Sequence, residues 1–153
     1  MNDDPYLDPR TGLLRNKLGI RDAEELRRAE RRLTTARAEQ GIPRGDFDLK
    51  HLQAIHRHLF QDVYDWAGKV RQIEISKGGH QFQFSKYIET GMADVHRRVR
   101  KADYFRGAPP DAFARGAAEI IGDVNYVHPF REGNGRTQRE YLKQLAERAG
   151  YRL

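Results

Sequence analysis

Apolar residues recur at intervals of three and four in five stretches of the chain, which is the spacing of one face of an α-helix. The first helix is expected to reach about Glu39, and the fifth is expected to start near Gly135. The five predicted faces consist of Leu26, Ala29, Leu33 and Ala36; Leu49, Leu52, Ile55, Leu59 and Phe60; Ile88, Met92, Val95 and Val99; Phe113, Ala117, Ile120, Ile121 and Val124; and Leu142, Leu145 and Ala149. We interpret all five faces as core rather than as cofactor surfaces.

Polar and glycine residues stand where these helices should begin and end. Asp22 and Glu25 form a pattern typical of a capping box, Asp48 precedes the second face, and Asp111 begins the fourth. Gly150 follows the fifth face, where a glycine can close a helix. These signals predict a mainly α-helical bundle.

One segment, between residues 68 and 85, departs from the helical pattern. Val70, Ile73 and Ile75, then Phe82 and Phe84, flank the sequence Lys77-Gly78-Gly79-His80. This pattern predicts a β-hairpin with a Gly-Gly turn. A lone two-stranded ribbon is marginal, so the hairpin must lie on other elements. It either covers the core, or its free edge accepts an extended segment of another protein.

Length and composition predict one globular domain over residues 1–153. The 153 residues are 38% hydrophobic and 33% charged, with no cysteine. No long apolar run or leader sequence indicates a membrane span or secretion, and the absence of cysteine fits a reducing cytoplasm. The net charge of +6 could indicate nucleic acid, but arginines alternate with glutamates in residues 21–39. We therefore predict a solvated helix face there and no direct nucleic-acid partner.

The segment from His128 to Arg139 concentrates the chemically useful residues of the chain. Gly133 and Gly135 can adopt backbone angles that are closed to other residues, so the N–H groups around Asn134 can form an anion-binding concavity at a helix start. Arg136 and Arg139 are three positions apart and would offer two guanidinium groups to phosphate oxygens. The segment is typical of a polyphosphate site.

A base and an acid precede this turn. His128 can accept a proton at neutral pH, and Pro129 disfavours helical geometry at His128, which places the imidazole at a helix end. Glu132 is a hard oxygen ligand that suits Mg²⁺ beside substrate phosphates. Each residue alone has an ordinary structural explanation, but their conjunction favours chemistry. Phe130 is the exception, and we expect it to be a core anchor.

Residues 128–139 resemble the signature of the Fic family, His-x-Phe-x-Asp/Glu-Gly-Asn-Gly-Arg-x-x-Arg, at every specified position. The similarity extends over nearly the whole chain. Upstream stretches that are similar to bacterial Fic proteins are Asp4-Pro5-Tyr6, Thr11-Gly12, Asn16-Lys17-Leu18-Gly19-Ile20, His56-Arg57-His58-Leu59-Phe60 and Val63-Tyr64-Asp65-Trp66-Ala67-Gly68-Lys69.

The resemblance implies a Fic fold, in which a β-hairpin flap lies over the active-site motif, and a protein adenylyltransferase. AMP would pass from ATP to a Ser, Thr or Tyr hydroxyl, with His128 as the catalytic base and Mg²⁺ or Mn²⁺ on Glu132. The phosphates would be bound by Gly133, Asn134, Gly135, Arg136 and Arg139. The target protein would bind along the flap residues Ile73, Ile75, Ser76, Lys77, Gly78, Gly79, His80 and Phe82. Two alternatives stay open: transfer of another nucleotide such as UMP or GMP, and an idle module that binds phosphate or nucleic acid.

The resemblance also bears on regulation. Fic proteins are commonly silenced by a helix with the pattern Ser/Thr-x-x-x-Glu-Gly/Asn, and two segments of this chain, 35–40 and 85–90, match it only in part. We therefore expect a small antitoxin-like inhibitory partner, as in toxin–antitoxin pairs. The expected location is the bacterial cytoplasm, or a host cell if the chain is the catalytic piece of a secreted effector.

Overall fold

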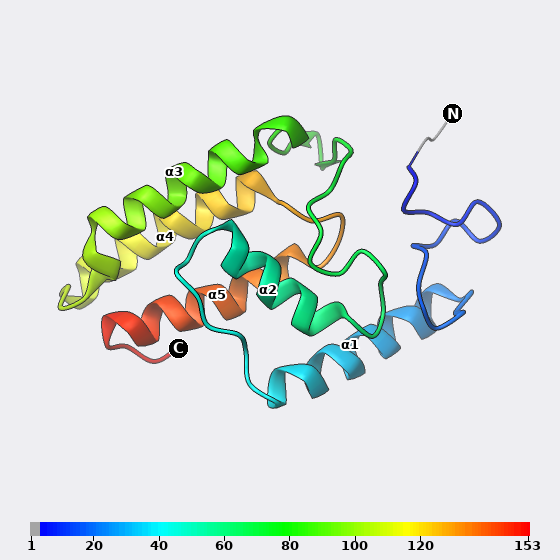
Figure 1. Cartoon of the computed structure of the whole chain (residues 1–153), viewed down its shortest axis with the longest axis horizontal. Coiled ribbons are helices and arrows are strands. Elements are labelled where there is room, and N and C mark those ends of the chain that lie inside the picture. Colours follow the sequence, from blue (N-terminus) through cyan, green and yellow to red (C-terminus); the bar gives the residue numbers. More distant parts are fainter. Residues whose placement is uncertain (1–3) are drawn as a thin grey trace.

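The computed structural model describes residues 4–153 and contains five α-helices and one short hairpin (Figure 1). The elements are α1 (Ala23–Glu39), α2 (Leu49–Phe60), β1 (Ser76–Lys77), β2 (His80–Gln81), α3 (Ile88–Lys101), α4 (Pro110–Val127) and α5 (Asn134–Ala149), with 3₁₀ turns η1 (Ser85–Tyr87) and η2 (Asp103–Phe105). This confirms the predicted mainly α-helical fold with one hairpin.

Helix α5 lies at the centre of the bundle. It packs against α2 on one side and α4 on the other, while α1 covers α2 and α3 lies along α4 (Figure 1). The main core contains fully buried side chains from α2, α3, α4 and α5, among them Leu52, Ile55, Met92, Val124 and Leu145. Helices α4 and α5 therefore carry the segment between them, residues 128–133, on a buried frame.

Three predicted helix ends are confirmed, whereas α4 begins at Pro110, one residue before the predicted Asp111, and has no side-chain cap. The Asp22 carboxylate accepts a hydrogen bond from the Glu25 amide at 2.9 Å, and the Asp48 carboxylate accepts one from the His51 amide at 3.0 Å. Gly150 ends α5 in the left-handed conformation with φ of 100°. The two aspartates satisfy backbone donors that a helix start leaves unpaired, and Gly150 donates its amide to the last turn of α5.

The predicted face of α1 is wrong at one position. Ala36 is exposed, and Thr34 is buried instead. The Thr34 hydroxyl donates to the Glu30 carbonyl at 2.7 Å, so the helix itself satisfies the polar group that is buried. Thr34 and Ala36 are two positions apart and lie on opposite flanks of the apolar stripe, and a pattern built on apolar residues selects the alanine rather than the threonine.

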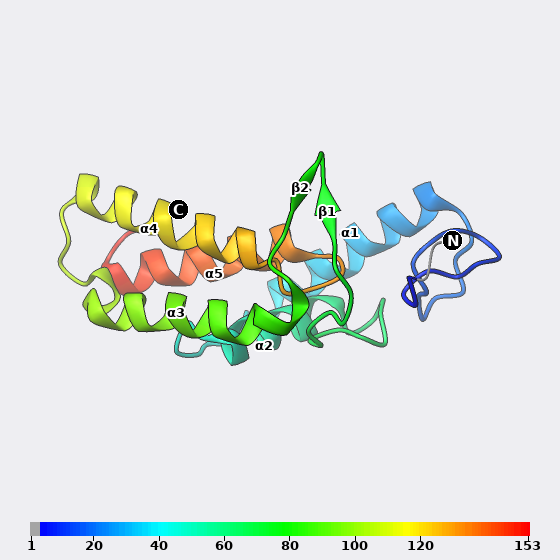
Figure 2. The same ribbon diagram turned by 90° about the horizontal axis from the view of Figure 1, so that it is seen from above.

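The hairpin is confirmed, but its ladder is shorter than the flanking apolar residues suggested. Ser76 pairs with Gln81 and Lys77 with His80, and all four residues are exposed. Gly78 and Gly79 have φ of 56° and 82°, the positive angles that a two-residue hairpin turn of type I′ requires. Figure 2 shows the hairpin standing out from the helical body near the α4–α5 connection.

Within the part of the chain that the structure describes, no helix combines the length and the apolar character needed to span a bilayer.

Candidate active site

The segment from His128 to Gly133 connects α4 to α5 and carries the predicted chemistry. His128 caps α4 in the left-handed conformation, with φ of 48° and ψ of 64°, and its amide donates to the Val124 carbonyl at 3.0 Å. Such angles are uncommon for a residue with a side chain and cost about 1 kcal/mol or more. As the following proline predicted, the imidazole lies at a helix end.

The ring of His128 is held from two sides. Its Nδ1 lies 2.9 Å from the Asn125 carbonyl oxygen, which can only accept, so Nδ1 carries the proton and Nε2 keeps its lone pair. The ring also stacks on Phe82 of the hairpin, with centroids 3.8 Å apart and planes 8° from parallel. Burial lowers the pKa of His128 below its usual value, which favours the neutral ring. The imidazole is therefore oriented as a base.

The side chain of Asn134 has a different role from the one that we predicted. Its Oδ1 accepts from the Phe130 amide at 3.0 Å, and its Nδ2 donates to the Phe130 carbonyl at 2.6 Å. Asn134 is 4% exposed and Phe130 is fully buried. The Asn134 amide group is thus used inside the loop, so only its backbone N–H is available to a phosphate. Phe130 is the core anchor that we expected.

His56 braces the same loop, and sequence reasoning missed this role. Its Nδ1 accepts from the Gly68 amide and its Nε2 donates to the Glu132 carbonyl, both at 2.8 Å. The ring is completely buried and stacks on Phe130 with centroids 4.0 Å apart. Burial is the main cause that lowers the pKa of His56 to about 4. A neutral, doubly bonded histidine therefore fixes the carbonyl that precedes the turn.

Gly133 and Gly135, the two glycines of the motif, differ in backbone conformation and in the space around them. Gly133 precedes α5 with φ of 86°, and a Cβ there would lie 2.5 Å from the Phe60 ring and 3.2 Å from Nε2 of His56. Gly135 lies within the first turn of α5, has no positive φ, and has open space where a Cβ would be. The predicted need for glycine angles therefore holds at Gly133 and is wrong at Gly135.

The start of α5 offers unpaired backbone donors. Within residues 4–153 no acceptor binds the amides of Asn134, Gly135 and Arg136, while the Thr137 amide donates to the Gly133 carbonyl. Arg136 is half-buried and Arg139 is exposed, and neither guanidinium forms an ion pair within the same residues. Free amides, a helix dipole and two unpaired cations together suit a polyphosphate.

Glu132 lies at the other side of this turn. Its carboxylate is exposed and accepts from the Gly133 amide at 3.1 Å. Beside it is a hollow of about 490 Å³, also lined by Glu30, Tyr64 and Arg131. The Tyr64 hydroxyl donates to Glu30 at 2.5 Å, and burial raises the pKa of Glu30.

The donor set at Glu132 suits one class of metal. No cluster of three acidic or histidine ligands occurs in the part of the chain that the structure describes. A single exposed carboxylate next to a phosphate site fits Mg²⁺, which is commonly held by one or two carboxylates together with substrate phosphates.

The flap residues divide into a bare tip and a packed base. Residues 76–80 are exposed, and nothing surrounds the Cβ positions of Gly78 and Gly79. Ile73, Ile75 and Phe82 are half-buried, and Phe82 touches the His128 ring. The structure thus places Phe82, where the flap joins the body, against the candidate catalytic residue His128, and it leaves the tip of the flap exposed.

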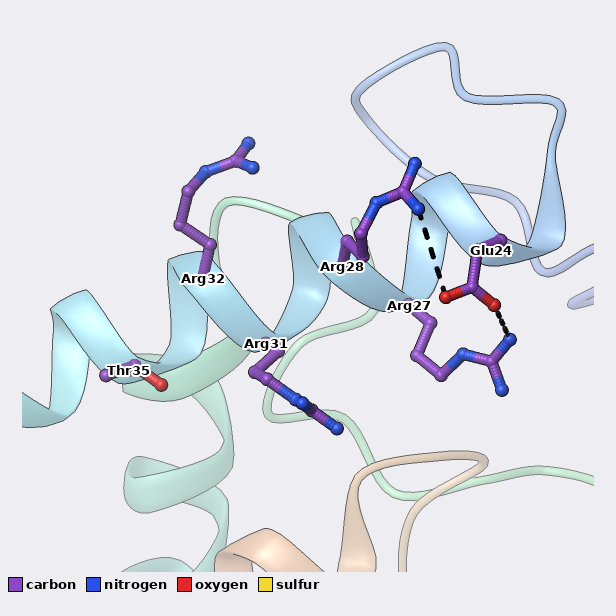
Figure 3. A pocket seen from close by; sticks show the side chains of 6 residues that line it. All are labelled: Glu24, Arg27, Arg28, Arg31, Arg32 and Thr35. Carbon is purple, nitrogen blue, oxygen red and sulfur yellow. Dashed lines mark hydrogen bonds and ion pairs between the residues drawn. The ribbon is translucent and has the colours of Figure 1, made fainter.

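A larger hollow, about 550 Å³, lies along α1 (Figure 3) and shares Arg27 with the hollow beside Glu132. Its side chains are Glu24, Arg27, Arg28, Arg31, Arg32 and Thr35. Figure 3 shows the guanidinium groups pointing in different directions, and only those of Arg27 and Arg28 pair with Glu24. The Arg27 and Arg28 side chains are 65% and 67% exposed. This face is the solvated helix surface that the alternating charges predicted.

Comparison with known proteins identifies the family. Residues 46–146 match the model of the Fic/DOC family. The chain belongs to the Fic/DOC family. A probable protein adenylyltransferase of Sinorhizobium fredii is 42% identical over 99% of this chain and 79% of its own length. The protein adenylyltransferase VbhT of Bartonella schoenbuchensis is 41% identical over 99% of this chain, which spans 32% of that larger protein.

Solved structures agree with this assignment. The N-terminal Fic domain of a VirB-translocated effector from Bartonella quintana, with bound ADP, has a TM-score of 0.91 and 28% identity over 97% of this chain and 78% of its own. The effector BepC of Bartonella tribocorum, with bound AMPPNP, has a TM-score of 0.89 and 26% identity over 95% and 78%. The Fic fold predicted from the motif is therefore confirmed.

Proposed function

We propose that this Fic chain is a protein adenylyltransferase that transfers AMP from ATP to a Ser, Thr or Tyr hydroxyl of a target protein. The observation that carries the proposal is the His128 ring, which keeps the lone pair of Nε2, stacks on Phe82 of the flap and shortly precedes the unpaired amides at the start of α5. Relatives named protein adenylyltransferases, and effector structures that hold ADP or AMPPNP, support ATP as the donor. We also propose that residues 1–153 form one catalytic domain.

His128 would act as the general base. Its Nε2 takes the proton of the target hydroxyl while the hydroxyl oxygen attacks the α-phosphorus of ATP in line. The bond between the α-phosphorus and the bridging oxygen breaks, and pyrophosphate leaves with the bonding electrons. The proton stays on His128 until solvent removes it. The neutral ring favoured by the lowered pKa of His128 is the form that this step needs.

The start of α5 would orient the donor. The amides of residues 134–136, which are unpaired in the described chain, would bind phosphate oxygens near the scissile bond, and Arg136 and Arg139 would bind the β- and γ-phosphates. Glu132 would hold Mg²⁺ or Mn²⁺, which when bound would offset the charge that grows on the leaving pyrophosphate. The Gly133 and Asn134 contacts described above keep this surface in shape.

The flap would hold the target. Its exposed two-residue ladder leaves main-chain groups at its edge, which can pair with an extended target segment. The residues that we propose for this contact are the flap residues predicted from the sequence: Ile73, Ile75, Ser76, Lys77, Gly78, Gly79, His80 and Phe82. Such main-chain recognition fits a protein substrate better than the nucleic-acid alternative.

Regulation would come from a separate partner. Glu39 and Glu89 form no ion pair with an arginine within residues 4–153, so neither masks Arg136 or Arg139 there. We propose that a small antitoxin-like protein supplies a glutamate that pairs with Arg139 and displaces the γ-phosphate. Several structural relatives are named as VirB-translocated effectors, which supports delivery into a host cell as an alternative to action in the bacterial cytoplasm.

The decisive experiment follows label from α-labelled ATP into the proteins of a cell lysate. His128→Ala should lower this transfer by 10²-fold or more while ATP binding stays nearly intact. Comparable transfer by the variant would overturn the role of His128. Glu132→Gln, or removal of divalent cations by a chelator, should also remove most transfer. Label from UTP or GTP in place of ATP would favour the other nucleotides.

A further inference from the structure

Arg71 is the largest fully buried side chain of the molecule as described, at 1% exposure. It lies between α2 and the flap in the sequence. A buried guanidinium is costly unless its donors are all paired. The nearest carboxylate, that of Glu74, is 3.5 Å away, half-exposed and bonded to Ser85. Something other than an ordinary ion pair must therefore satisfy Arg71.

Backbone carbonyl oxygens accept the hydrogen bonds of the Arg71 guanidinium. Within the flap, Nη1 donates to Ile73 at 2.7 Å and Nη2 donates to Gln83 at 2.5 Å. Toward α4, Nε donates to the carbonyl of His128 at 2.7 Å, and Nη2 also donates to that of Val127 at 3.1 Å. The backbone amide of Arg71 donates to the Pro129 carbonyl at 2.9 Å. One residue thus joins both legs of the hairpin to the end of α4.

These hydrogen bonds set the distance between the flap and His128. Ile73 lies on the leg that enters the hairpin and Gln83 on the leg that leaves it, while the other acceptors belong to the residue that carries the candidate base and its neighbours. The Gln83 amide also donates to the Tyr126 carbonyl at 3.0 Å, which adds a second tie to α4. Because the guanidinium is planar and rigid, its four bonds fix where the flap stands relative to His128.

We propose that Arg71 is a positioning residue that ties the flap to His128, so that a hydroxyl on a flap-bound segment meets Nε2 at a set distance. The inference rests on the proposed function. A displacement of about 1 Å at a reacting centre can cost about 100-fold in rate. ATP contacts should not depend on Arg71, because its bonds reach the flap and α4 and none reaches α5.

The test compares Arg71→Lys and Arg71→Gln with Lys69→Gln, an exposed residue two positions earlier. Lysine keeps the charge, but a single ammonium cannot reach four carbonyls. With lysate protein as acceptor and α-labelled ATP as donor, both Arg71 variants should lower the rate at saturating ATP by at least 10-fold. The ATP concentration at half-maximal rate should stay within two-fold. The Lys69 variant should match the wild type in both quantities.

Amide hydrogen exchange supplies a second readout that does not depend on transfer. In the Arg71 variants, exchange should speed up at residues 73–83 and stay unchanged in α2 and α5. Amide exchange at the wild-type rate in Arg71→Lys would overturn the proposal, because Arg71 would then be dispensable. Faster exchange throughout the helices would also overturn it, because Arg71 would then act on the whole core. If the wild-type chain transfers no nucleotide, the proposed function fails, and exchange alone still decides whether Arg71 ties the flap to α4.

Discussion

The motif loop, residues 128–133, and the flap meet where Phe82 stacks on His128, yet they are built differently. The loop of residues 128–133 is enclosed by buried groups: Phe130 lies in the core, and His56 and Asn134 bond to the loop backbone. The flap tip is a ladder of two residue pairs with every residue exposed. The phosphates of the nucleotide are the same in every reaction and suit a fixed site, whereas target segments differ and suit an open edge that binds through main-chain groups.

Two glycines with nearly equal angles test this contrast most strongly. Gly133 and Gly79 have φ of 86° and 82°, but only at Gly133 would a Cβ meet a neighbour, the Phe60 ring at 2.5 Å. Gly133→Ala should lose about 2–4 kcal/mol of unfolding free energy, since backbone strain and overpacking add. Gly79→Ala should lose about 1 kcal/mol or less, since the ladder can open locally. Urea unfolding measures both, and equal losses would contradict a braced loop.

Acid should weaken the loop through His56. Folding keeps His56 neutral, with a pKa of about 4, while the unfolded chain protonates this residue below about pH 6.5. Its contribution is therefore complete above pH 6.5 and is lost as the pH falls to about 4. The loss is on the order of 3 kcal/mol.

Unfolding measured from pH 7 to pH 4 checks this expectation. His51, whose pKa burial also lowers, adds a slope of the same sign, so the informative quantity is the difference between the wild type and His56→Phe. The His56 variant should be less stable at pH 7 and should show a shallower slope. His80→Gln, on the exposed flap, is the control, and an unchanged slope in the His56 variant would refute the assignment.

The third comparison is between two side-chain amides, Asn134 in the loop and Gln81 in the flap, which each form hydrogen bonds with backbone groups. Asn134 binds the amide and carbonyl of Phe130 inside the loop, whereas Gln81 donates to the carbonyls of Ile75 and Phe82 at 3.1 Å on the exposed flap. Asn134→Ala should cost about 1–3 kcal/mol because it leaves buried groups unpaired. Gln81→Ala should cost about 0.5 kcal/mol or less because water replaces its bonds. Similar losses would show that burial is not what separates the two regions.

The smallest effect on stability should accompany the largest effect on target choice. Replacing Lys77 and His80 by serine should change the unfolding free energy by no more than about 0.5 kcal/mol, since both side chains are exposed. The ATP concentration for half-maximal transfer should not change. The pattern of labelled lysate proteins on a gel should change, and an unchanged pattern would argue against target contacts at these side chains.

The sequence predicted the parts of the site whose chemistry lies in side chains. His128 at a helix end, Gly133 at a positive φ and the caps at Asp22 and Asp48 all follow from local rules that act within a few residues. The helical faces were predictable for the same reason. At Ala36 and Thr34 the prediction was wrong by two positions, because the helix itself satisfies a buried threonine.

The groups that hold the site in shape were not predictable. His56 lies 76 positions before its acceptor Glu132, and Arg71 lies 57 positions before His128. Both bind main-chain carbonyls, which every residue has, so no pattern of side chains marks the pairing. For His56 a signal was present: it follows Ile55 on a helix whose buried face it shares. For Arg71 no comparable signal exists.

The acceptors of Arg71 have a practical consequence for engineering. Ile73, Gln83, Val127 and His128 all bind it through carbonyl oxygens, so the clamp places no demand on the identity of the residues between 76 and 81. With Gly78 and Gly79 kept, because the turn holds both at positive φ, the other four residues of that hexapeptide can therefore be treated as a replaceable cassette. Libraries that randomise it, with Arg71 and both legs of the hairpin kept, should retain the scaffold while sampling new substrate preferences.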